Sequence, residues 1–331
     1  MREKRLRINL PLIVMSNKMT IKKKKISLVA PFYNEEQNAH LFFDRVAEVF
    51  SVVSEMYEYE VICVNDCSKD NTLNELIRIK NEKYSNLTII NFSRNFGKEA
   101  AITAGIDFAN GDAVVPIDSD LQHPPEVILD MIKKWESGFD VVLAKRRDRN
   151  TDSKLQKVTA NAFYNVASKI SHTEIPANVG DFRLFTKSVA NEIKKLRETS
   201  RFMKGIFAWV GFNTTYVEYT VAEREYGKTS FNTWKLWNFA LEAITSFSTI
   251  PLRIWSYVGA FISLISISYA IYLIIKTVFF GNPTPGYASL MVAILFFSGV
   301  QLIGIGILGE YVSRISKEVR NRPIYIIKEI F

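Results

Sequence analysis

The sequence predicts an α/β domain built on a mostly parallel sheet, followed by an amphipathic helix and a hairpin of two membrane-spanning helices. Between residues 26 and 150, short apolar runs alternate with amphipathic stretches, which is typical of parallel strands covered by helices on both faces. Near the C-terminus, two apolar segments each exceed the roughly 20 residues that cross a bilayer. The 331 residues are 48% hydrophobic and 23% charged, which excludes a disordered chain.

The first 25 residues form a basic tail. They hold nine Lys or Arg side chains and one acid, Glu3, so the tail accounts for the formal net charge of +8. Attraction to anionic lipid, at about 1 kcal/mol per basic residue, is one interpretation, and a solvated extension is the other. No basic stripe with interleaved aromatic residues follows, so we expect no nucleic-acid partner. Met19 is an alternative start to Met1.

The α/β domain is expected over residues 26–230. In its first half the predicted strands are Ile26–Ala30, Glu60–Val64, Leu87–Phe92, Ala113–Ile117 and Val141–Ala144. The predicted helices between them are Asn38–Tyr57, Asn71–Lys80 and Glu99–Ala109. The second half predicts a helix around Lys154–Ser171, a loop at Val179–Arg183, a helix near Lys187–Leu196 and a strand over Thr214–Ala222. The two cysteines, Cys63 and Cys67, are interpreted as structural thiols in a reducing compartment.

Residues 231–252 are expected to form a juxtamembrane helix. Apolar residues recur there at helical spacing, and Trp234, Lys235 and Trp237 lie among them, which favours a position in the membrane interface. A helix packed on the α/β domain is the alternative. The predicted hairpin covers residues 253–313, with spans at 254–280 and 288–312 joined by a Gly- and Pro-rich turn.

Basic residues flank the hairpin at its two ends and are absent from its turn. Arg253 precedes the hairpin, and the C-terminal tail, residues 314–331, begins with Arg314, Lys317, Arg320 and Arg322. The positive-inside rule therefore predicts a multi-pass protein of the cytoplasmic membrane, with its α/β domain and tail in the cytoplasm. The glycines of the second span permit close helix approach within the hairpin or in a homo-oligomer; ordinary membrane-helix composition is the alternative.

A pair of carboxylates, Asp118 and Asp120, directly follows the apolar run 113–117. In parallel sheets ligands bind beyond the carboxyl ends of the strands. Polar clusters also follow the first three predicted strands, at residues 34–36, 65–66 and 93–95, so we expect one site at this edge. Mg²⁺ commonly bridges one or two carboxylates to substrate phosphates, which indicates an enzyme acting on a nucleotide diphosphate. Turn and helix-capping chemistry is the alternative.

Five strings occur in an order that resembles a known family: SLVAPFYNEE, VNDCSKDNT, SRNFGKEAAITAG, DSDLQHPP and GDFRLF. Together they are similar to family 2 glycosyltransferases, which have the GT-A fold with its Rossmann-like sheet. With the interfacial helix and two spans, residues 26–322 resemble the polyprenyl-phosphate glycosyltransferases, a group that includes bactoprenol glucosyltransferases and dolichol-phosphate mannose synthases.

The resemblance implies a set of site residues. The nucleotide sugar would be bound by Pro31, Tyr33, Glu35, Asp66, Ser93, Gly97, Lys98 and Asp118. The metal, Mg²⁺ or Mn²⁺, would be held by Asp118, Asp120 and Gln122. Asp120 and Asp181 would be catalytic, with Asp181 either a general base or a residue that orients the acceptor or the sugar hydroxyls. His123 is interpreted as a loop or capping residue rather than a ligand.

The acceptor phosphate needs cations beside it. A phosphate monoester has a second pKa near 6, so at pH 7 it is largely a dianion and needs little deprotonation. Binding it near an anionic diphosphate requires positive charge, and Arg suits bidentate phosphate contact. The candidates are Arg146, Arg201 and Arg224.

The expected reaction is inverting transfer of one hexose from a nucleotide sugar, UDP-glucose first, to polyprenyl (undecaprenyl) phosphate at the cytoplasmic face of the membrane. GDP-mannose, UDP-N-acetylglucosamine and UDP-aminoarabinose type donors remain open. Two other classes are weighed against this: a processive polysaccharide synthase, whose Gln-x-x-Arg-Trp motif is missing, and a non-catalytic scaffold or flippase partner. The chain departs from the family pattern at Cys67, where a Gly is usual, and at Thr229-Ser230 in place of Ser-Lys.

Overall fold

The computed structural model describes residues 23–147, 179–199, 201, 203–220, 250–280 and 286–331. Several sequence predictions lie outside these residues: most of the basic tail and of the interfacial helix, the helix around Lys154–Ser171, the turn of the hairpin, and Arg224 with the loop that follows it.

One eight-stranded sheet forms the centre of the α/β domain, in the order β7-β5-β6-β4-β1-β2-β3-β8. The strands β4, β1, β2 and β3 are parallel to one another, whereas β6 and β8 run antiparallel to their neighbours. Their bounds are β1 Lys24–Phe32, β2 Tyr57–Asn65, β3 Leu87–Phe92, β4 Ala113–Pro116, β5 Val141–Arg146, β6 Val179–Thr186, β7 Thr214–Tyr219 and β8 Ile327–Ile330. The predicted mostly parallel sheet is confirmed.

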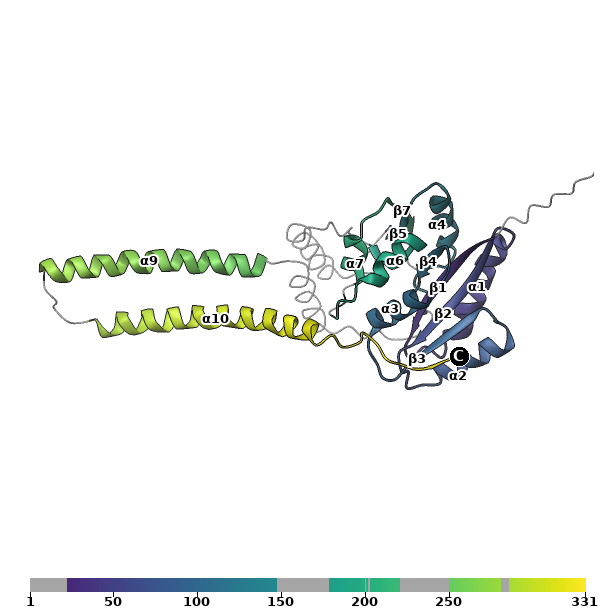
Figure 1. Ribbon diagram of the computed structural model, residues 1–331, viewed down its shortest axis with the longest axis horizontal. Helices are drawn as coiled ribbons and strands as arrows, with labels where there is room; N and C mark the ends of the chain where they lie inside the picture. Colours follow the sequence, from purple (N-terminus) through teal and green to yellow (C-terminus); the bar gives the residue numbers. More distant parts are fainter. Residues whose placement is uncertain (1–22, 148–178, 200, 202, 221–249, 281–285) are drawn as a thin grey trace, which may run out of the picture.

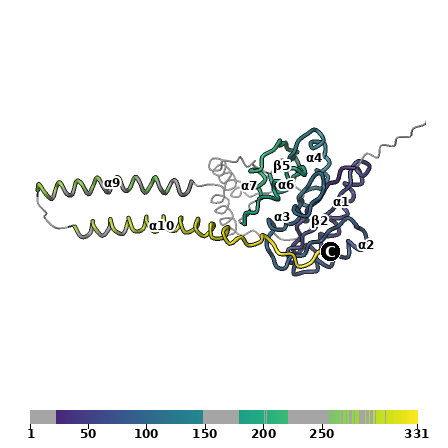
Figure 2. The backbone as a smooth tube through the Cα atoms, viewed as in Figure 1, coloured from purple at the N-terminus to yellow at the C-terminus, as the bar shows by residue number. Residues whose placement is uncertain are grey.

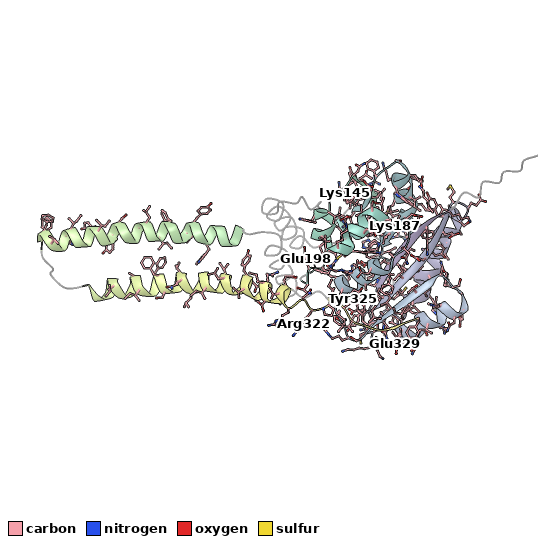
Figure 3. The ribbon with its side chains drawn as sticks, in the orientation of Figure 1. Lys145, Lys187, Glu198, Arg322, Tyr325 and Glu329 are labelled. Carbon is pink, nitrogen blue, oxygen red and sulfur yellow. The ribbon has the colours of Figure 1, made fainter. Side chains whose placement is uncertain are left out.

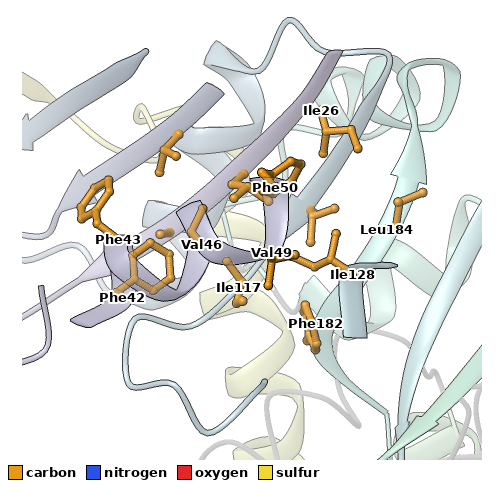
Figure 4. Close-up of a cluster of buried hydrophobic side chains, with 14 of the residues drawn as sticks. Ile26, Phe42, Phe43, Val46, Val49, Phe50, Ile117, Ile128, Phe182 and Leu184 are labelled. Carbon is orange, nitrogen blue, oxygen red and sulfur yellow. The ribbon is translucent and has the colours of Figure 1, made fainter. Parts of the chain in front are cut away.

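Helices cover both faces of the sheet, as the apolar strands require. Their bounds are α1 Ala39–Val53, α2 Thr72–Glu82, α3 Lys98–Phe108, α4 Val127–Glu136, α6 Lys187–Lys195 and α7 Met203–Trp209. Side chains of α1, α2 and α4 pack on one face, where Phe42, Phe43 and Phe50 are fully buried (Figure 4). Side chains of α3, α6 and α7 pack on the other face. The hydrophobic core therefore has two halves, one on each side of the sheet.

Gly105 shows how closely α3 packs on the sheet. A Cβ atom at this position would lie 2.1 Å from Cγ1 of Val29 on β1. No side chain fits there, so the glycine allows α3 to lie directly against the central strand. Because α3 begins at Lys98, this contact also fixes the position of Lys98, and of the loop before it, relative to the sheet.

Two long helices, α9 Ile250–Phe280 and α10 Tyr287–Val319, form a hairpin that projects away from the sheet (Figures 1 and 2). They contain the two predicted spans. A Cβ atom on Gly304 of α10 would lie 1.9 Å from Nε1 of Trp255 on α9, so this glycine permits close packing within the hairpin. Over the part of the chain that the structure describes, one segment, Phe296–Val319, is long and apolar enough to cross a membrane by length and composition. This segment overlaps the predicted span 288–312, whereas the predicted span 254–280 stays a prediction.

The C-terminal residues differ from the expected tail. The helix α10 continues to Val319, and β8 then pairs with β3 at the edge of the sheet. The sequence analysis did not identify this strand, because Ile327–Ile330 is short and follows a basic stretch. The unpaired backbone groups of β3 provide the partner that makes it a strand.

Candidate active site

The carboxyl ends of β1, β2, β3 and β4 meet at one edge of the sheet, and the predicted site residues follow them. Tyr33 follows β1, Asp66 follows β2, Ser93 follows β3, and Asp118 lies just beyond β4. Because β6 runs antiparallel to β4, its first residues lie at the same edge, and Asp181 is among them. Topology thus gathers residues that are far apart in the chain.

Lys98 joins the two carboxylates most central to the expected chemistry. Its Nζ lies 2.7 Å from Oδ1 and 2.9 Å from Oδ2 of Asp118, and 3.2 Å from Oδ2 of Asp181. Lys98 is the first residue of α3, and Gly97 before it has a φ of +96°, a conformation that favours glycine. The turn at Gly97 therefore directs Lys98 into the carboxylate pair.

The charges in this group stabilise one another. Despite burial, Lys98 and His123 hold the pKa of Asp118 well below its ordinary value. Burial likewise opposes ionisation of Asp181, yet Lys98 and Lys204 lower its pKa. Burial lowers the pKa of Lys98, but the charges of Asp118 and Asp181 outweigh it and raise that pKa. Both carboxylates and the ammonium are therefore charged at neutral pH.

The loop after β4 is fixed by its own hydrogen bonds. The Ser119 hydroxyl donates to the carbonyl of Pro31 at 2.9 Å, and the backbone N–H of Gln122 donates to Oδ1 of Asp120 at 3.2 Å. Ser119 and Asp120 are buried. These bonds hold Asp118 and Asp120 at the edge where β1 and β4 end.

A divalent cation fits these carboxylates. Ionised Asp118 and the neighbouring Asp120 offer the hard oxygen ligands that Mg²⁺ and Mn²⁺ prefer. Within the described residues, no group of three or more His, Cys, Asp or Glu is arranged to hold a metal. A cation bound here would therefore take its remaining ligands from water and substrate phosphates, which is the usual way in which proteins bind Mg²⁺.

His123 lies in the loop between β4 and α4, and its side chain is buried. Its Nε2 lies 3.5 Å from Oδ2 of Asp118, and the Tyr219 hydroxyl lies 2.7 Å from its Nδ1. Arg146, at the end of β5, hydrogen-bonds Tyr219 in turn. The structure thus links Arg146, a predicted acceptor residue, to Asp118 through two other side chains. Sequence reasoning missed Tyr219, which carries no motif.

Asp66 organises the loop between β3 and α3. Its Oδ1 accepts the backbone N–H of Phe96 at 2.7 Å, and its Oδ2 accepts that of Gly97 at 2.9 Å. Burial raises the pKa of Asp66 despite these bonds. The next residue, Cys67, has a φ of +55°, so the position where the family usually has Gly adopts a conformation that favours Gly. The predicted contact of Asp66 with the base stays a prediction.

Tyr33 and Glu35 lie on the loop after β1. Tyr33 is exposed, whereas Oε2 of Glu35 accepts a hydrogen bond from Asn38 at 2.5 Å, and the Glu35 amide donates to the Thr72 hydroxyl at 2.9 Å. These bonds tie the loop to the start of α1 and α2. An exposed ring on a fixed loop suits the predicted nucleoside pocket.

Two further charged side chains, Glu99 and Arg183, lie near Asp181, and the sequence motifs predicted no role for either. Glu99 is next to Lys98 in the chain, and its Oε2 is buried without a hydrogen-bond partner among the described residues, as is Oδ1 of Asp181. Burial and then the charge of Asp181 raise the pKa of Glu99. Arg183 donates to the carbonyl of Gly180 at 2.6 Å and stacks on the Phe207 ring at 4.1 Å. Adjacency to Lys98 was the only sequence signal for Glu99.

Arg201, another predicted acceptor residue, is buried between α6 and α7. Its Nη1 donates to the carbonyl of Leu196 at 2.6 Å, whereas its Nε and Nη2 have no hydrogen-bond partner in the described part of the chain. Burial lowers its pKa. The structure therefore gives Arg201 a structural contact and leaves its predicted phosphate contact untested.

Two regions of the chain match described families. Residues 27–194 match Glycosyl transferase family 2, and residues 250–315 match the GtrB C-terminal hairpin. The chain is 53% identical over 305 residues to the SfII prophage-derived bactoprenol glucosyl transferase of Shigella flexneri, covering 92% of this chain and 98% of that protein. It is 50% identical over 307 residues to an uncharacterized glycosyltransferase of Synechocystis sp., covering 93% and 96%.

Sequence identity to solved structures is lower than to these relatives. Glucosyl-3-phosphoglycerate synthase from Mycobacterium tuberculosis, in complex with Mn²⁺, uridine diphosphate and phosphoglyceric acid, shares 16% sequence identity with this chain. The alignment covers 67% of this chain and 76% of that one, with a TM-score of 0.46.

Proposed function

The chain belongs to glycosyl transferase family 2, with the GT-A fold and a GtrB C-terminal hairpin, and we propose that it transfers glucose from UDP-glucose to polyprenyl phosphate at the cytoplasmic face of a membrane. The observation that carries this proposal is the Asp118–Lys98–Asp181 group at the end of the parallel strands, in a chain that continues into the hairpin. Relatives named bactoprenol glucosyl transferase at 53% identity support glucose and the lipid acceptor.

The donor would bind across the strand ends. Asp118 and Asp120, with Gln122 beside them, would hold a divalent cation, which neutralises charge on the diphosphate as the sugar leaves. Lys98 already balances the two carboxylates, so it is placed to share its charge with the diphosphate. Tyr33 and Glu35 would line the nucleoside pocket from the loop after β1.

The acceptor needs orientation more than deprotonation. The lipid phosphate is largely a dianion at neutral pH, and the low pKa of Asp181 makes it a weak base. Asp181 therefore acts in this proposal by orienting the acceptor or the sugar hydroxyls. Arg146, Arg201 and Arg224 are the proposed phosphate-binding residues. Direct attack by the phosphate oxygen on the anomeric carbon inverts its configuration and needs no covalent intermediate.

Sugar transfer to lipid tests the proposal. Membranes containing the protein would be incubated with undecaprenyl phosphate, Mg²⁺ and radiolabelled UDP-glucose, with GDP-mannose and UDP-N-acetylglucosamine in parallel. We expect label from UDP-glucose in the organic phase, lost with EDTA and in Asp120→Asn. Label from another donor would correct the sugar. No label from any donor, with the protein folded, would favour a non-catalytic scaffold.

The negative charge of Asp181 provides a second readout. Asp181→Asn keeps the shape and removes the charge, whereas Asp130→Asn removes an exposed carboxylate on α4. We expect Asp181→Asn to lower kcat about 10²-fold or more, the effect typical of a preorganised electrostatic group, and Asp130→Asn to leave kcat much closer to that of the wild type.

A further inference from the structure

The chain after α10 returns to the catalytic sheet beside the predicted nucleotide loop, residues 93–98. Strand β8 pairs with β3, and the ladder extends beyond it, because the Ser93 amide donates to the carbonyl of Ile326 at 3.0 Å. Ser93 is the first residue of the loop. Figure 3 labels Tyr325 and Glu329 on this returning segment. The backbone of the last residues therefore contacts the loop directly.

Tyr325 supports the loop through a row of three aromatic rings. Its ring stacks on Phe92, the last residue of β3, with centroids 5.3 Å apart and planes at 12°. Phe92 meets the edge of Phe96 at 5.6 Å. The backbone N–H of Phe96 then donates to Asp66 at 2.7 Å. The row thus ends at the carboxylate that organises the loop.

The hydroxyl of Tyr325 secures the other end of α3. It donates to Oδ2 of Asp107 at 2.7 Å, and Arg197 binds the same carboxylate with two bonds of 2.7 and 3.0 Å. Asp107 lies in the last turn of α3, and Lys98 begins this helix. One side chain therefore contacts both the strand that enters the loop and the helix that leaves it.

The end of α10, where the returning segment starts, is also held against the α/β domain. Near the end of α10, the Glu318 carboxylate accepts the backbone N–H of Thr199 at 2.9 Å and its hydroxyl at 2.7 Å. Tyr325 follows Glu318 by seven residues in the chain. The short segment from Glu318 to Tyr325 is therefore held at one end by Thr199 and at the other by the contacts of Tyr325 with Phe92 and Asp107.

We propose that Tyr325 is a positioning residue for donor binding: by holding the loop 93–98 against Asp66 through Phe92 and Phe96, it keeps Gly97 and Lys98 preorganised for the nucleotide of the donor. This inference rests on the proposed function, which places the donor at this loop. Preorganisation improves affinity because binding then pays less ordering entropy. Loss of Tyr325 should accordingly weaken donor binding while the chemical groups remain in place.

The test uses the full-length protein in detergent, with UDP and Mg²⁺ as the probe. In Tyr325→Ala we expect the Kd for UDP and the KM for the donor to rise about two- to tenfold, the range that aromatic pairing supports, with kcat changed less. Tyr325→Phe keeps the stacked ring and loses only the hydrogen bond to Asp107, so its Kd and KM should lie closer to those of the wild type than to those of Tyr325→Ala. Glu329→Ala, an exposed change on the same returning segment, is the matched control.

Hydrogen exchange makes the test independent of the nucleotide. The Phe96 and Gly97 amides, which bond Asp66, should exchange faster in Tyr325→Ala than in the wild type or Glu329→Ala. Unchanged exchange together with an unchanged Kd in a folded Tyr325→Ala would overturn the inference. If that variant misfolds, Tyr325→Leu, which keeps an apolar group without the stacking, decides by the same two readouts. Failure of the wild type to bind UDP would instead contradict the proposed donor.

Discussion

Lys98 is the residue on which the charge balance of the site depends. Motif position indicated that it lies near the nucleotide, but its contacts with Asp118 and Asp181 appear only in the fold. A lysine held between two carboxylates keeps both ionised. It also balances their mutual repulsion before any substrate binds.

Replacing Lys98 by Met should change both the rate and its pH dependence. Lys98 lowers the pKa of Asp118, so the variant should raise that pKa and move the acidic limb of kcat/KM to higher pH. At pH 7 we expect kcat/KM to fall about 10²-fold, as for other preorganised charged groups. Lys98→Arg keeps the charge, so the acidic limb of its kcat/KM profile should stay at the pH of the wild type. A pH–rate profile with an unshifted limb in Lys98→Met would contradict this account.

Ionisation of Glu99 should lower the free energy of unfolding at neutral pH. Burial and the charge of Asp181 raise its pKa, and an acid with a raised folded-state pKa loses stability as the pH rises above its unfolded pKa. That loss begins above about pH 4.3 and cannot exceed about 1.4 kcal/mol per pH unit. We therefore expect Glu99→Gln to melt at a higher temperature than the wild type at pH 7.

The difference in melting temperature between Glu99→Gln and the wild type should disappear at low pH, where Glu99 of the wild type is protonated in both the folded and the unfolded state. Melting temperatures at pH 7 and about pH 3, below the unfolded pKa of glutamate, would show this. Glu329→Gln, an exposed carboxylate on β8, serves as the control. A Glu99→Gln protein that is less stable than the wild type at pH 7 would show that the ionised carboxylate is needed in the fold.

At the scale of elements, the contact of α3 with β1 sets the site. The hydrophobic periodicity predicted both elements, and the sequence showed a glycine at 105 without a reason for it. In the fold, that glycine faces Val29, and the helix carries Lys98 and Glu99 at its start. Small shifts of α3 therefore move charged groups of the site.

Gly105→Ala should destabilise the protein. Alanine gains about 1 kcal/mol in helix propensity, but its Cβ would lie 2.1 Å from Val29. We expect a net loss of about 1–3 kcal/mol, the usual cost of overpacking a core, measured by thermal unfolding. The double variant Val29→Ala/Gly105→Ala relieves the clash and should be more stable than the sum of the single effects. If the double variant is destabilised by the sum of the two single effects, Gly105→Ala does not destabilise the protein through a clash with Val29.

At the scale of the whole molecule, β8 connects the hairpin to the sheet. Without it, β3 becomes an edge strand with unpaired backbone groups. Ile324, Tyr325 and Ile327 pack against the α3 side of the core, so their loss also exposes apolar surface.

Removing residues 324–331 should weaken the α/β domain while leaving α10 intact. From the half-buried side chains we expect a loss of at least about 2 kcal/mol, and a melting temperature lower by roughly 5–10 °C. The shortened protein should also aggregate more readily on heating, because its edge is open. Glu329→Ala in the full chain should behave as the wild type. Equal melting of the shortened and full-length proteins would show that the sheet does not depend on β8.

The sequence by itself determined the α/β class, the five apolar strands, the order of the polar loops and the position of the hairpin. Each of these depends on local periodicity or on a motif that one segment carries. Tertiary structure alone decided that Lys98 bridges Asp118 and Asp181, that Tyr219 supports His123, and that the C-terminal residues complete the sheet. These contacts join residues distant in the chain, and no local pattern encodes a partner that only the fold brings near.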